Sequence, residues 1–135
     1  MFYMSFQGWK LMEQYATENE IQYQKVIKAR TDHEKGGHYP MIDWKKDIPR
    51  RCIQIGNWNL QLYSSLDERI GFDFQDHFAI GNFKDMRVYF DMFNNLYRLS
   101  HEFEYEPKQW HGEYCLSLWL SMNGIGCEVL LNHEK

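Results

Sequence analysis

The sequence predicts a single α+β domain over residues 1–135, with an antiparallel sheet of about five to seven strands and two covering helices. Two segments carry apolar residues at the helical period, and the segments between and after them alternate apolar and polar residues as strands do. Gly, Asn and Pro separate these segments where turns are expected. A chain of 135 residues is long enough for one hydrophobic core, and it contains no repeat or long linker.

The first predicted element is a helix over residues 5–19, with Ser5 as its N-cap. Its apolar positions are Phe6, Trp9, Met12 and Ala16. Period-two alternation then predicts a strand over residues 21–30, in which Ile21, Tyr23, Ile27 and Ala29 share a face. A hairpin turn at residues 34–37 leads to a return strand over 38–44, which Pro40 places at a sheet edge. Further strands are expected over residues 51–56, 58–64 and 70–80.

The clearest element is a helix over residues 83–101, with Asn82 as its cap and Asp85 three residues later. Its apolar stripe covers about half of the circumference at roughly 100° per residue, so two sides of the helix need cover. That cover is either the sheet and the first helix, or the sheet and another chain. The second alternative predicts a homodimer through the 83–101 helix.

The C-terminal part predicts a hairpin of strands 114–120 and 127–131, joined by the turn at residues 122–126. The leucines of the first strand occupy the core face, which leaves Trp119 on the other side with Ser117 and Ser121. Two interpretations of Trp119 stay open. It is either exposed, or buried beneath the first helix.

Composition restricts the class of protein. Residues 1–51 contain nine Lys or Arg against seven acids, whereas residues 52–135 contain six against twelve, and this balance disfavours general nucleic-acid binding. Three cysteines without metal-site spacing favour reduced thiols in a cytoplasmic protein. No secretory signal or membrane-spanning apolar run is present in the sequence.

Three groups of residues invite a catalytic or metal-binding interpretation. They are His101 to Glu106 with His111, the pair Asp73 and His77, and the turn residues Asp32, His33, Glu34 and His38. The first lacks the His spacing of a zinc protease helix, the second lacks a nucleophile motif, and the third has the composition of a solvated turn. We therefore predict no catalytic residue, metal or cofactor.

The aromatic content is high, with 23 Trp, Tyr and Phe residues, and Tyr and Trp are frequent anchors of protein interfaces. Two sets of residues are candidates for binding a partner. One combines Trp110 and Trp119 with the acidic residues Glu102, Glu104 and Glu106. The other combines Trp44 with the basic residues Lys45, Lys46, Arg50 and Arg51.

These features favour a small protein-binding domain that is not an enzyme and that neutralises a partner by covering its surface. In size and character the chain is similar to phage-encoded inhibitors of host defence and to toxin-immunity proteins, although no motif assigns it to a family. The expected partner is a host defence component, a toxin or a nuclease. The alternatives are a small hydrolase-like enzyme using His, Asp and Glu groups, and a homodimeric module that binds nucleic acid or a small ligand.

Overall fold

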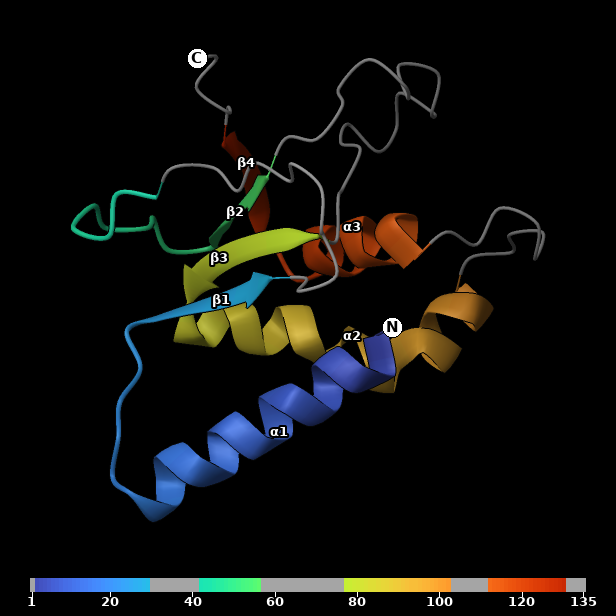
Figure 1. The fold of residues 1–135 in the computed structure, drawn as a ribbon. Coiled ribbons are helices and arrows are strands. Elements are labelled where there is room, and N and C mark those ends of the chain that lie inside the picture. Colours follow the sequence, from blue (N-terminus) through green and yellow to red (C-terminus); the bar gives the residue numbers. More distant parts are fainter. Residues whose placement is uncertain (1, 30–41, 57–76, 103–111, 131–135) are drawn as a thin grey trace, which may run out of the picture.

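The computed structural model describes residues 2–29, 42–56, 77–102 and 112–130. These ranges form an α+β fold of three helices and a four-stranded sheet (Figure 1). The elements in chain order are α1 (Phe2–Glu18), β1 (Lys25–Ala29), β2 (Cys52–Gly56), β3 (Phe78–Asn82), α2 (Phe83–Glu102), α3 (Gly112–Met122) and β4 (Gly126–Leu130). The predicted α+β class is confirmed. No helix within these ranges has both the length and the apolarity needed to cross a membrane.

The sheet of the described residues is mixed, with the strand order β1-β3-β2-β4. Strand β3 pairs antiparallel with β1 and β2, whereas β2 and β4 pair in parallel. The prediction of an antiparallel sheet is therefore wrong for β2 and β4, and the described residues form four strands where five to seven were predicted. Parallel neighbours need a long crossover, and the chain between β2 and β4 includes β3, α2 and α3.

The segment that was predicted as the strand 114–120 belongs to helix α3 instead. Its residues are almost all apolar, so a period of two and a period of 3.6 both fit the sequence. The buried side chains, Cys115, Leu116, Trp119 and Leu120, have the spacing of a helix face. The segment also lacks β-branched residues, which would have favoured a strand. The predicted hairpin is consequently absent, and β4 pairs with β2.

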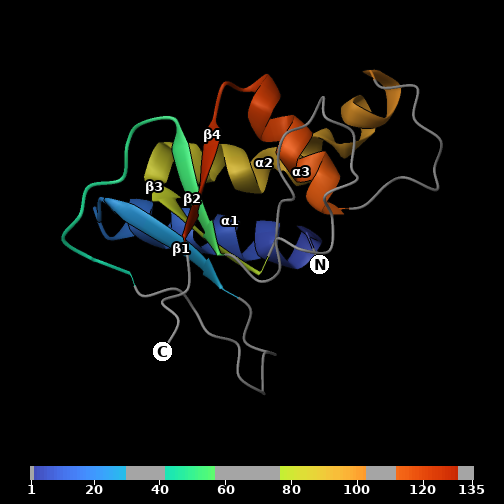
Figure 2. The same ribbon diagram turned by 90° about the horizontal axis from the view of Figure 1, so that it is seen from above.

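Helix α2 confirms the prediction for residues 83–101 almost to the residue. The side-chain oxygen of Asn82 accepts a hydrogen bond from the backbone N–H of Asp85 at 3.0 Å, as an N-cap does. The helix lies between the sheet and α1, and α3 packs against it (Figure 1). Seen from above, the strands lie in front of α1 and α2 (Figure 2). The two-sided cover that the wide apolar stripe requires thus comes from the chain itself.

A glycine lets α2 approach the sheet closely. On the sheet face that carries Val26 and Ile53, Gly81 is their neighbour in the register. A Cβ atom at Gly81 would lie 3.0 Å from Cγ of Met86 and 3.3 Å from Cγ1 of Ile53. Met86 and Ile53 are both fully buried, so a larger residue at this position would force the helix away from the sheet.

Aromatic rings fill the contact between α1 and α2. Trp9 packs between Phe83 and Phe90, with ring centroids 4.9 and 5.2 Å from its own. One turn along each helix, Phe6 stacks on Phe93 at 5.6 Å. Such ring pairs add to the free energy of burial, so much of the high aromatic content serves this contact.

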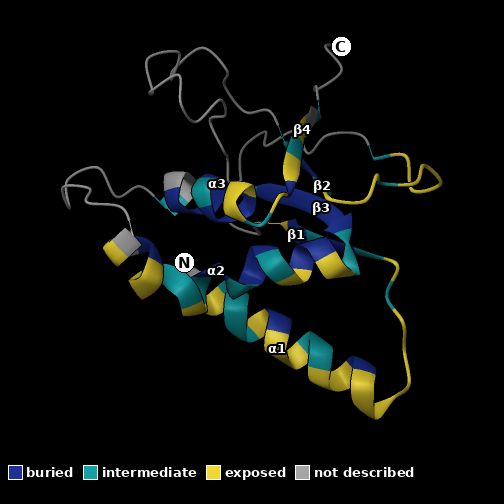
Figure 3. Cartoon of the chain, turned by 180° about the vertical axis from the view of Figure 1, so that it is seen from behind, coloured by how far each residue is buried: buried dark blue, intermediate teal, exposed yellow. Residues whose placement is uncertain are grey.

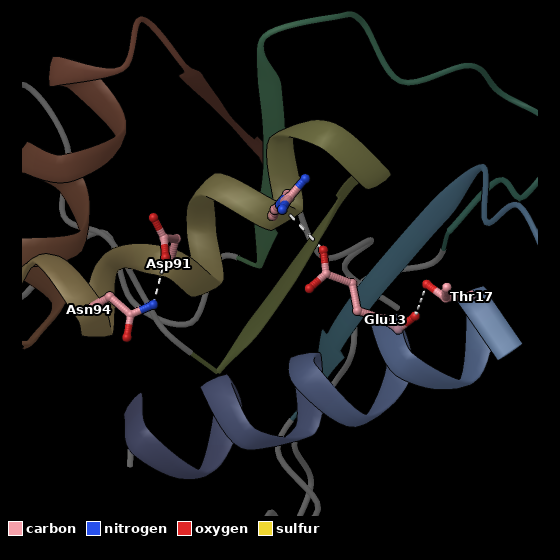
Figure 4. Close-up of polar contacts among 5 residues, drawn as sticks. Glu13, Thr17, Asp91 and Asn94 are labelled. Carbon is pink, nitrogen blue, oxygen red and sulfur yellow. Dashed lines mark hydrogen bonds and ion pairs between the residues drawn. The ribbon is translucent and has the colours of Figure 1, made fainter.

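Figure 4 shows polar contacts at the surface of α1 and α2, one of which, an ion pair, crosses between the two helices. Glu13 of α1 forms an ion pair with Arg87 of α2 at 3.3 Å, and the Thr17 hydroxyl donates to the Glu13 carbonyl at 2.9 Å. The side chain of Asn94 donates to Asp91 at 2.8 Å. These groups are largely exposed, and we expect them to contribute little stability.

Several local predictions are corrected. Helix α1 begins at Phe2, so Ser5 lies inside the helix and is not its N-cap. In β1 the buried residues are Val26 and Lys28, the opposite face from the predicted one. Residues 42–44 form no strand, and Trp44 lies in a turn. The predicted strand 58–64 and residues 30–41 and 70–76 lie outside the described residues.

Candidate protein-binding surface

The site is built on a junction around Asp85, in the first turn of α2. This carboxylate is buried, at 8% exposure, and accepts hydrogen bonds from the backbone N–H of Arg51 at 2.8 Å and from the side chain of Asn82. Three parts of the chain, the end of β3, the start of α2 and the residue before β2, therefore meet at one side chain. Because the carboxylate already lies at the N-terminus of the helix, this terminus is unsuited to binding a phosphate.

Arg51 connects this junction to the turn between α3 and β4. Its φ of 56° is left-handed, a conformation that costs energy for a residue with a Cβ atom. The structure holds it from two sides, since its N–H is bound by Asp85 and its carbonyl accepts the N–H of Gly126 at 2.9 Å. Its guanidinium donates to the Asn123 carbonyl at 3.0 Å. Arg51, predicted to bind a partner, thus fixes the end of the 42–51 segment.

The other end of that segment is a turn that presents Trp44. The ammonium group of Lys25, in β1, donates to the carbonyls of Trp44 and Lys46 at 2.7 and 2.6 Å. The side chain of Asp43 accepts the N–H of Lys45 at 3.0 Å, as in an Asx turn. The indole of Trp44 nevertheless stays 63% exposed. A large apolar side chain is therefore held in solvent on a turn that is itself fixed.

An open groove of about 1320 Å³ begins beside this turn. Its walls are residues 21–25, residues 47–51, the first turn of α2 and the turn before β4. Pockets for small ligands occupy roughly 300–1,000 Å³, so the groove is wider than one small molecule needs. It can take an extended or looped segment of another protein.

The groove has a positive charge balance. Lys25, Arg50, Arg51 and Lys84 line it, against Asp47 and Asp85. Asp85 is buried and bound by N–H groups, which leaves Asp47 as the exposed acid of the lining. Lys45 and Lys46 are also exposed on the adjoining turn. This surface is complementary to a partner that offers carboxylates around an apolar pocket.

The structure separates the predicted binding residues. Trp44, Lys45, Lys46 and Arg50 are exposed on one segment, as predicted. Trp119 is only 6% exposed, and its indole N–H donates to the Val88 carbonyl of α2 at 2.8 Å. Trp119 is therefore buried, but against α2 and not beneath the first helix as the second interpretation supposed, and it serves the packing of α3 on α2. Trp110, Glu104 and Glu106 lie outside the described residues, and Glu102 is the last residue of α2.

The described residues do not assemble a metal site. They contain no cluster of three or more His, Cys, Asp and Glu with the geometry to hold a metal ion. His77 precedes β3, but Asp73 lies outside the described ranges, as does His111. The hydrolase alternative therefore stays a prediction.

The cysteines of the described residues form no disulfide; Cys115 is buried, and Cys52 and Cys127 are half-buried. Burial, with the nearby Cys52, raises the pKa of Cys127 to about 12. Burial also raises the pKa of Cys52, and the charges of Glu128 and Asp85 act in the same direction. A raised pKa keeps the thiol protonated, so these two cysteines are poor nucleophiles at neutral pH.

Comparison with family models, with curated proteins and with solved structures finds no match.

Sequence reasoning missed Lys25, the residue that fixes the Trp44 turn. Its partners lie 19 and 21 residues along the chain, so no local pattern marks it. Asp43 was detectable, because Asp before a Trp-Lys-Lys sequence is a frequent start of a turn.

Proposed function

We propose that this chain is a protein-binding domain that attaches to its partner through Trp44 and the adjoining basic groove. The single observation that supports this most strongly is the exposed indole on a turn held by Lys25. Trp is among the residues most often found at the energetic centre of protein interfaces. A binding residue that is already held in place loses little conformational entropy on association.

The mechanism that we propose is occupancy. The indole enters an apolar pocket of the partner, while Lys45, Lys46 and Arg50 lie against acidic groups around it. Opposite charges accelerate the encounter, and apolar burial slows dissociation. A domain that covers its partner's surface in this way neutralises it stoichiometrically, as an anti-defence or toxin-immunity protein would.

The test compares immobilised wild type with two variants in a pull-down from host lysate treated with nuclease. The Trp44→Ala variant should lose a specific protein that wild type retains. The matched control is Tyr97→Ala, which removes an equally exposed aromatic ring from α2 and should retain that protein. Quantitative mass spectrometry measures the ratio, and we expect at least a tenfold loss for Trp44→Ala, which corresponds to about 1.4 kcal/mol.

Two results would contradict the proposal. If both variants retain the same proteins as wild type, Trp44 is not the anchor. If untreated lysate gives a Trp44-dependent complex that nuclease removes, the basic residues and the indole bind nucleic acid by charge and stacking. If the proposal holds, titration of this chain with the purified partner should give a stoichiometry of one to one.

A further inference from the structure

Helix α1 has two apolar faces, and only one of them is covered. Trp9 and Ala16 are buried on the side that packs on α2. On the opposite side Met4, Leu11 and Tyr15 are 71%, 68% and 55% exposed. Figure 3 shows this outer side of α1 mostly as exposed surface. Of the eight exposed large hydrophobic side chains of the described residues, four lie on this helix, which concentrates the apolar surface there.

The exposed residues form one stripe along the helix. Met4, Gly8, Leu11 and Tyr15 follow one another at spacings of four, three and four residues, the pattern of a helix-pairing seam. We call these four residues the outer stripe. Of the charged residues of α1, Lys10 lies over the Phe6 ring at 5.6 Å and Glu13 pairs with Arg87. Glu18, three residues after Tyr15, is exposed at the next position of the same seam, at the end of the helix. The outer stripe itself is uncharged.

We propose that the outer stripe is a self-association surface, through which two copies of this chain pair their α1 helices in an antiparallel dimer. The stripe is complementary to itself under a two-fold axis. An axis that crosses the helix between Trp9 and Lys10 places Met4 opposite Tyr15 of the second copy, and Gly8 opposite Leu11. A Leu side chain then fills the space that a glycine leaves, and a thioether meets an aromatic ring.

Gly8 favours a second copy of α1 as the partner that covers the outer stripe. A Cβ atom at Gly8 would meet nothing within 4 Å, so the chain's own fold does not require a glycine there. Glycine in the middle of an exposed helix is destabilising relative to alanine, so its presence at position 8 needs an explanation other than helix stability. Close approach of a second helix supplies that reason. The flanking residues Gln7 and Gln14 are neutral, and the antiparallel arrangement places the two Glu18 side chains at opposite ends of the seam, so two copies meet without repulsion between like charges.

The area of the outer stripe fits a weak dimer. From the exposed fractions, the three large side chains contribute on the order of 350 Å² per copy, or about 700 Å² for the pair. The flanking glutamines and the backbone at Gly8 extend this toward the roughly 1,000 Å² at which specific interfaces begin. We therefore expect an equilibrium between monomer and dimer in the micromolar range.

The experiment is sedimentation equilibrium of the full chain over a range of micromolar concentrations. Wild type should associate reversibly to a dimer. The Leu11→Glu variant should stay monomeric, whereas the matched control Tyr97→Glu, an apolar-to-acidic change on α2, should dimerise like wild type. The Gly8→Ala variant should raise the thermal midpoint of the dilute monomer yet weaken association at least tenfold.

The register is tested by mixing two variants. The Leu11→Glu and Gly8→Lys variants should each be monomeric alone. In an equimolar mixture, the antiparallel register places the acid introduced at position 11 of one variant opposite the base introduced at position 8 of the other. The second contact of the same dimer pairs the native Gly8 of the first variant with the native Leu11 of the other. The mixture should therefore recover a dimer.

The proposal is overturned if wild type is monomeric throughout, if Leu11→Glu still dimerises, or if the mixture stays monomeric while both variants are folded by circular dichroism. Partner capture through Trp44 is measured separately. Failure of this dimer therefore leaves the proposed function untouched.

Discussion

The carboxylate of Asp85 binds groups from three parts of the chain that the sequence separates widely. It accepts the N–H of Arg51, which is 34 residues away, and the side chain of Asn82. Replacing it therefore has two consequences. The first turn of α2 loses a negatively charged group at the positive end of the helix, and the N–H of a strained residue loses its acceptor.

We predict that Asp85→Ala lowers the free energy of unfolding by about 1.5–3 kcal/mol, because two hydrogen bonds to a charged group are lost. Urea denaturation followed by circular dichroism measures the change. The control is Asp85→Asn, whose amide oxygen still accepts one of these hydrogen bonds and should cost less. An alanine variant as stable as wild type would show that the junction does not hold the 42–51 segment.

The Cys127 thiol gives a pH-dependent prediction. Burial and the nearby Cys52 raise its pKa to about 12, from an ordinary value of 9.0. Above pH 9 the unfolded thiol ionises while the folded one keeps its proton, so the folded state binds more protons. The stabilising contribution is complete below pH 9 and is lost as the pH rises from 9 toward 12.

The measurement is the thermal midpoint of wild type and Cys127→Ala between pH 8 and 11. Wild type should lose stability more steeply than the variant over this window, because lysines and tyrosines titrate alike in both proteins. If the thermal midpoints of the two proteins fall in parallel with pH, the Cys127 thiol does not stay protonated in the folded protein, which contradicts the raised pKa.

At the scale of elements, helices α1 and α3 end in the same way with different residues. In α1 the N–H of Ile21 donates to the Ala16 carbonyl at 2.8 Å, and in α3 that of Ile125 donates to the Leu120 carbonyl at 2.9 Å. Both are the 6→1 hydrogen bonds of a Schellman motif, which needs a left-handed residue just before. Gly124 supplies it after α3, with a φ of 66°.

Glu20 holds the corresponding position after α1, with a φ of 55°. We predict that Glu20→Gly raises the free energy of unfolding by about 0.5–1 kcal/mol, because glycine adopts this conformation without strain. Gly124→Ala is the reciprocal control and should lower it by about 1 kcal/mol or more. Denaturant midpoints of the two variants should move in opposite directions. If both midpoints move in the same direction, backbone strain at the left-handed residue is not what changes the stability.

Elements with complete local signals were predictable from the sequence, and the others were not. For α2 the cap, the acidic first turn and the apolar stripe all lie within the helix and agree, so its limits were predicted closely. For α3 the apolar run satisfied both periods, and the absence of β-branched residues was the signal that distinguished them. The parallel pairing of β2 with β4 depends on strands more than 70 residues apart, as in the Gln54–Glu128 hydrogen bond, which spans 74.

Part of the candidate surface was likewise predictable from local sequence, and part was not. The sequence predicted Trp44 and its basic neighbours because charge and aromatic clusters are local properties. It did not predict that Lys25 fixes their turn, and it could not decide the exposure of Trp119, which α3 buries against Val88. The outer stripe of α1 was present in the sequence at helical spacing, but only the fold tells which of two apolar faces is covered.

At the scale of the whole molecule, the layered arrangement explains why two surfaces stay exposed. The sheet and α1 both cover α2, so the widest apolar helix is buried within the chain. Of the eight exposed large hydrophobic side chains of the described residues, Met4, Leu11 and Tyr15 lie together on the outside of α1, and Trp44 stands apart from them on its turn. The two proposals, self-association and partner binding, therefore concern separate surfaces of the molecule.

The most direct test of the central claim is amide hydrogen exchange of this chain with and without the partner captured through Trp44. We predict new protection in residues 42–51 and in the groove wall at residues 21–25, with little change on α3. The same pattern should vanish for Trp44→Ala at equal concentrations. Protection confined to other segments, or equal protection in the variant, would contradict the assignment of Trp44 as the anchor.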